Sequence, residues 1–425
     1  MFSEAAGPFY HKRYIWLALI VLLIVAWIFA QRPVRIMLQT APNVPHARAA
    51  QPVINIQSLS EWENETIHRL KWAFESEVYG RIPLDLELKE TGRQKLPGVH
   101  FDNTATVETF QFELTNPRNG KTREFGLVCV IPAGTKTETP LIISQNFCPN
   151  HNVIPVEGIP VPDSIGFDCS GDGMISDVFL YVFGRYITTP PIAEIMKRGY
   201  GFAAMYPSEF VPDHATSGQA VLGAMFDGDA DNFRPGALAA WAAQFAIISN
   251  HLKTDERFSD VIAYGHSRYG KTALISSAYN PNIDAVLAHQ SGTGGASLSR
   301  NKPGETVADI VKGYPHWFGR KYAEYAKDQS AMPIDQHQLL ALVAPRPVLL
   351  GNARRDVWSD PAGGFRAASG ANPAYKIYGS EGLTAEKLYQ FKPGDDLSFW
   401  IRPGTHGVVE EDWPAFLDFL DAHFR

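Results

Sequence analysis

The stretch VIAYGHSRYGK, residues 261–271, decides how this chain is expected to fold. Its first four residues are apolar or aromatic, Gly265 interrupts them, and the segment RYGKTALISSAY follows directly after Ser267. This order predicts a strand, a sharp turn and a helix, the local structure that exposes a nucleophilic serine in the pattern G-x-S-x-G. Here the second glycine comes one place later, at Gly270. The displaced glycine leaves open whether this turn holds a nucleophile.

Short β-rich runs alternate with helical stretches on both sides of this segment. Several runs are continuously apolar, which is typical of strands buried on both faces of a parallel sheet. The expected strands are FQFEL, FGLVCVIP, PLIISQN, YGFAAMYP, VIAYG, IDAVLAH, RPVLLGN and LSFWIRPG. The alternation predicts a doubly wound, mostly parallel sheet, and we expect an α/β-hydrolase fold over residues 58–425. In such sheets the active site lies at the carboxyl ends of the strands.

Helices are also expected from local signals. The sequence SEWE at residues 60–63 has the spacing of a capping box and begins an amphipathic helix, which Gly80 ends. Residues 236–252 carry large apolar side chains at steps of three and four, as a buried helix does. Asp412 is the expected N-cap of the last helix.

An uncharged apolar run, YIWLALIVLLIVAWIFA, occupies residues 14–30. It has the length of a short membrane span and exceeds the usual core of a signal peptide. We therefore expect residues 1–35 to be a cytoplasmic tip and transmembrane anchor, followed by a linker at 36–57; a cleaved signal is the alternative. Either alternative exports the catalytic body, as a periplasmic domain on the inner membrane or as a processed envelope protein.

The composition fits one globular domain, with 45% hydrophobic residues in a chain of 425. The net charge is −7 and no cluster of Lys and Arg occurs, so nucleic acid is not an expected partner. We expect a monomer. The three cysteines, Cys129, Cys148 and Cys169, allow one disulfide; Cys148 and Cys169 could pair in an exported protein, and buried free thiols are the alternative.

Three expected strand ends carry a nucleophile, an acid and a base in the chain order of α/β-hydrolases. Ser267 comes first, Asp356 and Asp360 follow RPVLLGN, and His406 lies just ahead of the final helix. A serine hydroxyl is a weak nucleophile, so it needs an imidazole to take its proton and a carboxylate to orient that imidazole. The sequence thus predicts a catalytic triad. We favour Asp356 as its acid because Asp360 precedes Pro361 and is expected to cap a local turn.

The motif G-x-S-R-x-G-K around Ser267 resembles the nucleophile motif of glucuronoyl esterases, with the bacterial branch as the better match. The likeness covers about residues 60–425. It continues in SGTGGASLSR (291–300), GET (304–306), PHWF (315–318), DQHQLLALVAPRP (335–347), DVWSDPAG (356–363) and RPGTHG (402–407). The resemblance implies hydrolysis of the ester between 4-O-methyl-glucuronic acid on glucuronoxylan and an alcohol, as in lignin–carbohydrate complexes.

Further site residues follow from the motif and from the resemblance. Arg268 could present its backbone N–H and its guanidinium to a developing oxyanion. Lys271 lies one helical turn after the nucleophile and could donate to sugar hydroxyls or a carboxylate. The resemblance implies that Glu305 and Trp358 hold the uronate ring, with Gln338 as a further candidate.

The chain departs from one branch of the family before the SG of SGTGG. Fungal-type members have a glutamate there that serves as the triad acid, whereas this chain has Gln290. Because an amide carries no negative charge, the acid should come from the loop that contains Asp356.

No metal or cofactor is expected. DGDADN, residues 227–232, has alternating carboxylates like a calcium loop but lacks the glycine and the final acid that such a loop needs. Two other functions stay open at this point: an esterase for acetyl-xylan or another carbohydrate ester, and a non-catalytic, envelope-tethered protein that binds glycans.

Overall fold

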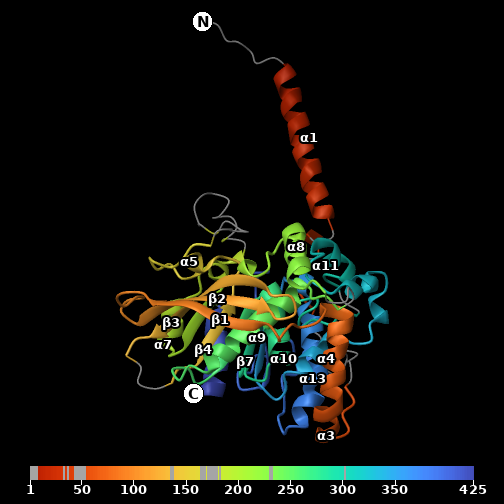
Figure 1. Cartoon of the computed structure of the whole chain (residues 1–425). Helices are drawn as coiled ribbons and strands as arrows, with labels where there is room; N and C mark the ends of the chain where they lie inside the picture. The colour runs from red at the N-terminus through yellow and green to blue at the C-terminus, as the bar shows by residue number, and fades with distance from the viewer. Residues whose placement is uncertain are drawn as a thin grey trace.

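The protein is described from a computed structural model, drawn in Figure 1. The structure describes residues 8–31, 34–35, 38–42, 54–134, 138–162, 169, 180, 183–228, 233–300 and 303–425. A nine-stranded sheet lies at the centre of the body and helices cover its two faces. One long helix, α1 (Pro8–Ala30), projects from the body (Figure 1).

The sheet is mixed and mostly parallel, with the strand order β1-β2-β3-β5-β4-β6-β7-β8-β9. From β5 to β9 every neighbouring pair is parallel, whereas β1, β2, β3 and β5 pair antiparallel. The strands are β1 (Glu87–Lys95), β2 (Ala105–Asn116), β3 (Lys121–Pro132), β4 (Leu141–Gln145), β5 (Gly201–Met205), β6 (Val261–His266), β7 (Ala285–His289), β8 (Val348–Ala353) and β9 (Leu397–Arg402).

The eight apolar runs all form strands, so the expected mostly parallel sheet is confirmed. Strand β1 was not expected from the sequence. Its residues, ELKETGRQK, are polar apart from Leu88 and Gly92, and none is fully buried; within the described chain β1 is an edge strand that pairs with β2. A strand without a buried face has no alternation of apolar residues by which it could be recognised.

Two hydrophobic cores lie on opposite faces of the sheet, and neighbouring strand residues such as Ile262 and Ala263 belong to different ones. Helices α9 (Ala237–Lys253), α10 (Arg268–Tyr279), α12 (Gln336–Ala341) and α13 (Pro361–Lys376) bury residues in the first core. Helices α7 (Ile192–Lys197) and α14 (Asp412–Phe424) bury residues in the second. Two further helices, α8 (Ala215–Met225) and α11 (Val307–Gly313), lie near the foot of α1 (Figure 1).

The first helical segment of the body starts two residues before its expected cap. The side chain of Ser58 accepts a hydrogen bond from Glu61 N at 3.1 Å, because SLSE at 58–61 has the same spacing as SEWE. The segment runs through α3 (Leu59–Glu61), η2 (Trp62–Thr66), α4 (Ile67–Phe74) and η3 (Glu75–Tyr79). It ends, as expected, at Gly80, whose φ is 76°.

Asp412 is not the cap of α14 but its first residue. Its carboxylate accepts two bonds from Arg402 Nε at 2.9 Å and one from Val409 N at 2.9 Å. The side chain is fully buried. The carboxylate of Asp412, which was expected to cap the helix, therefore pairs with the buried guanidinium of Arg402.

Helix α1 is long and apolar enough to cross a membrane by length and composition. Residues Arg13–Ala30 have a mean hydropathy of 2.3 and none of this segment is buried against the body. A signal sequence meets the same criteria, so the helix is consistent with a signal or an anchor.

Part of the expected linker at 36–57 is packed against the body. The backbone N of Ala41 donates to Arg354 O at 2.5 Å, and the hydroxyl of Tyr389 donates to Ala41 O at 2.6 Å. Ala41 and Ile54 are both buried in the core. The chain is thus fixed to the body well before residue 58.

Cys148 and Cys169 form a disulfide, and Cys129 is a buried free thiol. One of the two alternatives that the sequence left open is therefore realised. The bond ties the end of β4 to a segment of the long connection between β4 and β5.

Candidate active site

Ser267 lies in the sharp turn between β6 and α10. Its backbone has φ 56° and ψ −121°, and its N–H donates to His289 O at 2.8 Å, at the end of the neighbouring strand. A positive φ at a residue other than glycine costs about 1–3 kcal/mol and persists only where the surroundings impose it. This is the backbone geometry that exposes a serine hydroxyl above a parallel sheet.

The two glycines of the motif allow this turn to close. A Cβ added to Gly265 would lie 2.0 Å from Tyr269 O. Because this oxygen belongs to the backbone, no movement of a side chain would remove the clash. A Cβ on Gly270 would lie 2.9 Å from both Gly265 O and His289 O. The glycine displaced by one place therefore permits the close contact between helix and strands that the usual pattern achieves one residue earlier.

His406 is bonded to the acid predicted for it. His406 Nδ1 and Asp356 Oδ2 are 2.7 Å apart, and Asp356 is 1% exposed. Burial raises the pKa of the Asp356 carboxyl, but the charge and hydrogen bond of His406, together with bonds from Ser359, lower it further, so the pKa lies below its usual value. A carboxylate on Nδ1 fixes the tautomer that leaves Nε2 free to accept a proton.

The second candidate, Asp360, has a different role. It is the N-cap of α13, with φ 55°, and its Oδ1 accepts from Gly363 N at 2.9 Å. The expected local cap is therefore found, and it is Asp356 that bonds His406.

Gln290 holds the loop that carries His406. Its Oε1 accepts from Gly407 N at 2.8 Å and its Nε2 donates to Thr405 O at 3.2 Å. The amide thus bonds the backbone on both sides of the histidine. A glutamate could accept the first bond but could not donate the second.

Arg268 is held by a carboxylate that the sequence analysis missed. Its guanidinium pairs with Asp213, which also accepts from Trp317 Nε1 at 2.9 Å and bonds His316 Nε2 at 3.1 Å. Burial raises the pKa of Asp213, but the bonds from His316, Arg268 and Trp317 outweigh it and lower the pKa to about 2. The guanidinium also lies 4.7 Å from the ring centroid of Trp317 and 5.3 Å from that of Tyr314. Its position is therefore fixed by charge and by stacking.

A cavity of about 560 Å³ brings most of the predicted site residues together. Its size is that of a small-molecule site. The predicted residues in its wall are Ser267, Arg268, Lys271, Glu305, Asp356, Trp358 and His406.

The residues proposed to contact the substrate are held by hydrogen bonds to the backbone. Lys271 is 4% exposed and its Nζ donates to Ser291 O. The backbone of Glu305 donates to Trp358 O at 2.8 Å, so the two residues expected to hold the uronate share one backbone contact.

Gln338 does not line this cavity, which corrects the expectation for it. Its side-chain oxygen accepts from Asp335 N at 2.9 Å, as the reciprocal half of the capping box that starts α12. The DQHQ segment therefore serves the helix start, where its Asp-x-x-Gln spacing is a capping signal.

Three histidines lie against one another behind the nucleophile. His266 Nδ1 and His289 Nδ1 are 3.2 Å apart, and the rings of His266 and His406 have centroids 4.6 Å apart. Burial lowers the pKa of His266 well below its usual value, and the nearby His406 and His289 lower it further. His266 is therefore neutral beside the catalytic candidate.

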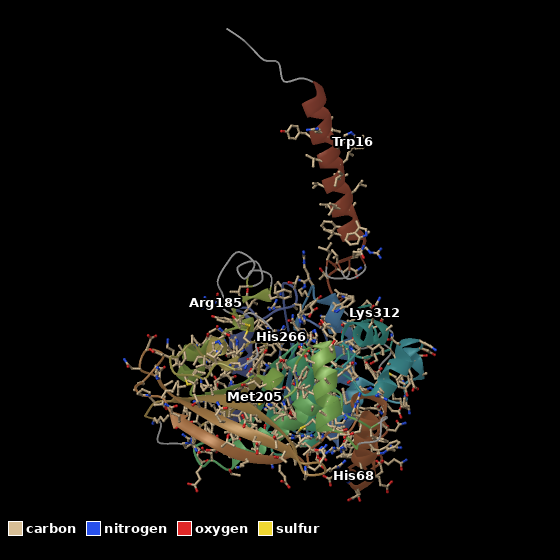
Figure 2. All side chains as sticks on the ribbon, turned by 45° about the horizontal axis from the view of Figure 1, so that its top comes forward. Trp16, His68, Arg185, Met205, His266 and Lys312 are labelled. Atoms are coloured by element: carbon tan, nitrogen blue, oxygen red, sulfur yellow. A yellow bond between two sulfur atoms is a disulfide. The ribbon has the colours of Figure 1, made fainter. Side chains whose placement is uncertain are left out.

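Figure 2 shows His266 toward the end of the body from which α1 projects. Of the cavity residues that the sequence analysis missed, Asp213 follows β5 and its 3-10 turn η5 (Pro207–Glu209). Its place after the carboxyl end of a strand was the signal that could have identified it. Two aromatic residues of the cavity wall, Tyr314 and Trp317, lie next to and within the PHWF motif at 315–318, for which the sequence suggested no role.

Residues 196–379 match a family model described as glucuronyl esterase, fungi. Carbohydrate esterase MZ0003, from an unknown prokaryotic organism, is 29% identical over 404 residues, which is 90% of each chain. A promiscuous CE15 esterase from a marine bacterial metagenome superposes with a TM-score of 0.76 at 27% identity, over 90% of this chain and 98% of that one. The glucuronoyl esterase from Solibacter usitatus gives 0.73 at 25% identity, over 91% and 99%.

Proposed function

Because the chain belongs to the CE15 glucuronoyl esterase family, we propose that it is a serine carboxylic-ester hydrolase acting on esters of (4-O-methyl-)glucuronic acid carried by glucuronoxylan. The observation that carries this proposal is one cavity lined by Ser267 on its strained turn and by the Asp356–His406 pair. Geometry of this kind supports acyl transfer through a serine.

In the proposed reaction, Ser267 Oγ attacks the ester carbonyl carbon while His406 Nε2 takes its proton. The carbonyl oxygen becomes an oxyanion, and the C–O bond to the alcohol then breaks as His406 returns the proton to the leaving oxygen. Water repeats these steps on the acyl-enzyme and releases the uronic acid. Asp356 stays ionised throughout and stabilises the imidazolium, as its lowered pKa supports.

Arg268 is the proposed oxyanion donor. Its backbone N–H is the first of α10 and so has no partner within the helix. Its guanidinium is oriented by Asp213, and one well-aimed donor is worth about 3 kcal/mol in the transition state.

The uronate ring is proposed to lie between Trp358, Glu305 and Lys271. An indole face suits the apolar face of a sugar, and the two charged groups suit its hydroxyls. One of the solved structures similar to this chain is that of a promiscuous CE15 esterase. The range of acyl groups that this chain hydrolyses is therefore the property to measure.

The test compares a benzyl ester of glucuronic acid with acetylated xylan. Changing Lys271→Met keeps the buried stem but removes the ammonium. The transition state for the glucuronate ester should lose about 1.5–3 kcal/mol of stabilisation, so kcat/KM on that ester should fall roughly 10- to 150-fold. Acetate release should be spared. Equal losses on both substrates, with an unchanged melting temperature, would argue for a general carbohydrate esterase.

For localisation, we propose that α1 anchors the catalytic body to the inner membrane and that the body lies in the periplasm. The exposed apolar surface of α1 and the Cys148–Cys169 disulfide support an exported, oxidising location. Cleavage of α1 as a signal would leave the same body free in the envelope.

A further inference from the structure

A second cavity, of about 530 Å³, lies between α8, α11 and the 3-10 segment η6 (Arg320–Ala326). We call it the basic cavity, because Arg234, Lys312 and Arg320 line it. No Asp or Glu lines it within the part of the chain that the structure describes. Arg234 and Lys312 are the two cations on which the argument rests, and in a chain with 45 acidic and 38 basic residues a basic wall favours an anionic ligand.

The basic cavity is separated from the ester cavity by a shared wall. Tyr314 lines both cavities, and its ring stacks on Trp317 with centroids 3.7 Å apart. His316 lines the basic cavity and its Nε2 bonds Asp213, the carboxylate that orients Arg268. The wall is therefore aromatic, and its residues continue into the wall of the ester cavity.

The side chains of the basic cavity indicate which class of ligand it would bind. The ring of Tyr314 in the wall suits the apolar face of a sugar, and guanidinium and ammonium groups pair with a carboxylate. Gln219 adds an amide for hydroxyl groups. A sugar ring with a free carboxylate, a uronate, combines all of these properties.

We propose that the basic cavity binds a second, unesterified uronate on the same glycan whose esterified uronate occupies the ester cavity. The inference rests on the proposed function and deepens it, since it makes glycans with two or more uronates the preferred substrates. Tyr314 lines both cavities, so the two proposed binding sites for one glycan are neighbours; Figure 2 shows Lys312 and His266 in the half of the body nearer to α1.

The kinetic test uses two xylo-oligosaccharide esters, one with an additional free glucuronic acid and one without it. The wild-type chain, kept full length in a neutral detergent, should have a KM about five-fold lower for the first substrate, with the advantage lost at high salt. The double variant Arg234→Gln/Lys312→Gln should abolish the difference between the two KM values. Lys387→Gln removes an exposed cation far along the chain and should keep it.

A binding test separates this inference from the proposed function. Ser267→Ala protein is saturated with benzyl glucuronate, and a xylo-oligosaccharide with one free glucuronic acid is titrated by calorimetry. Binding should persist, be lost in the double variant, and be absent for the neutral oligosaccharide.

Equal binding of the neutral oligosaccharide, or no effect of the double variant, would overturn the inference. Binding of phosphatidylglycerol vesicles that is lost in the double variant, with no binding of the oligosaccharide, would assign the cavity to anionic lipid and overturn the inference as well. Failure of the wild-type chain to hydrolyse benzyl glucuronate would contradict the proposed function instead. The titration without that ester would still measure binding at the basic cavity.

Discussion

At the scale of residues, the site is held by hydrogen bonds that each use a specific atom. Asp356 bonds His406 Nδ1, Asp213 bonds Arg268, and Gln290 bonds the backbone on both sides of His406. A neutral amide at 290 positions the histidine without supplying charge. The acid and the loop support are therefore on different residues in this chain.

The choice between the two aspartates gives a sharp prediction. Asp356→Asn should lower kcat by roughly 10³- to 10⁴-fold with the fold retained, because the imidazolium of His406 loses its charge partner. Asp360→Asn is the matched control, since asparagine also caps helices and tolerates the left-handed φ, and its kcat should change little. Steady-state kinetics on a glucuronate ester checks both. Collapse in Asp360→Asn with near-normal Asp356→Asn would reverse the assignment.

At the scale of elements, the pattern of apolar residues predicted the elements that are buried. Strands β4 to β8 are buried along their whole length, so their runs are apolar and easy to recognise. Edge strand β1 packs a single apolar side chain, Leu88, partly against the core and so left no such pattern. Ser267, His406 and Asp356 follow strands or precede a helix, so chain order predicted them. The contacts of Asp213 with Arg268, His316 and Trp317 join residues far apart in the chain, which local sequence does not encode, whereas the Asp-x-x-Gln spacing at 335–338 was a local signal for a cap.

Helix α12 makes a prediction on acid stability. His337 on this helix is buried and its Nδ1 has no hydrogen-bond partner within the described chain. Burial lowers the pKa of His337 to about 4; Asp335 opposes this effect and Arg300 adds to it. The unfolded chain therefore binds this proton more readily, so stability is present above about pH 6.5 and is lost as the pH falls toward 4.

In urea titrations at pH 7, 6, 5 and 4, the wild-type free energy of unfolding should fall more steeply than that of His337→Gln. The difference should reach about 3 kcal/mol by pH 4. Parallel pH profiles of the two proteins would contradict a neutral, buried His337.

At the scale of the whole molecule, a short segment joins helix α1 to the body. Ala41 is bonded to Arg354 and Tyr389, so at most about ten residues, 31–40, separate the end of α1 from the body. Fully extended, ten residues span about 35 Å. If α1 is an anchor, as we propose, it holds the body within this distance of the membrane surface; Figure 2 shows His266 in the half of the body nearer to α1.

Two truncations test this arrangement. Removal of residues 1–35 should give a protein that is soluble without detergent and keeps its kcat/KM. Removal of residues 1–57 also deletes the buried Ala41 and Ile54, and burial of an isoleucine side chain is worth about 1.5–3 kcal/mol. Its melting temperature should therefore fall by several degrees. Equal melting temperatures would show residues 36–57 to be a free linker, and a native N-terminus near Gln31 would show cleavage.

The most direct measurement is the rate of hydrolysis of benzyl glucuronate by the wild-type chain, Ser267→Ala and the control Ser276→Ala. Ser276 is a buried serine on the same helix, bonded to Ala273 O and outside the cavity. We expect wild-type and Ser276→Ala proteins to turn over the ester, and Ser267→Ala to lose at least about 10⁴-fold in kcat with an unchanged melting temperature. Comparable rates for Ser267→Ala and the wild type, or no hydrolysis by a folded wild-type chain, would contradict the assignment of this protein as a serine esterase of glucuronate esters.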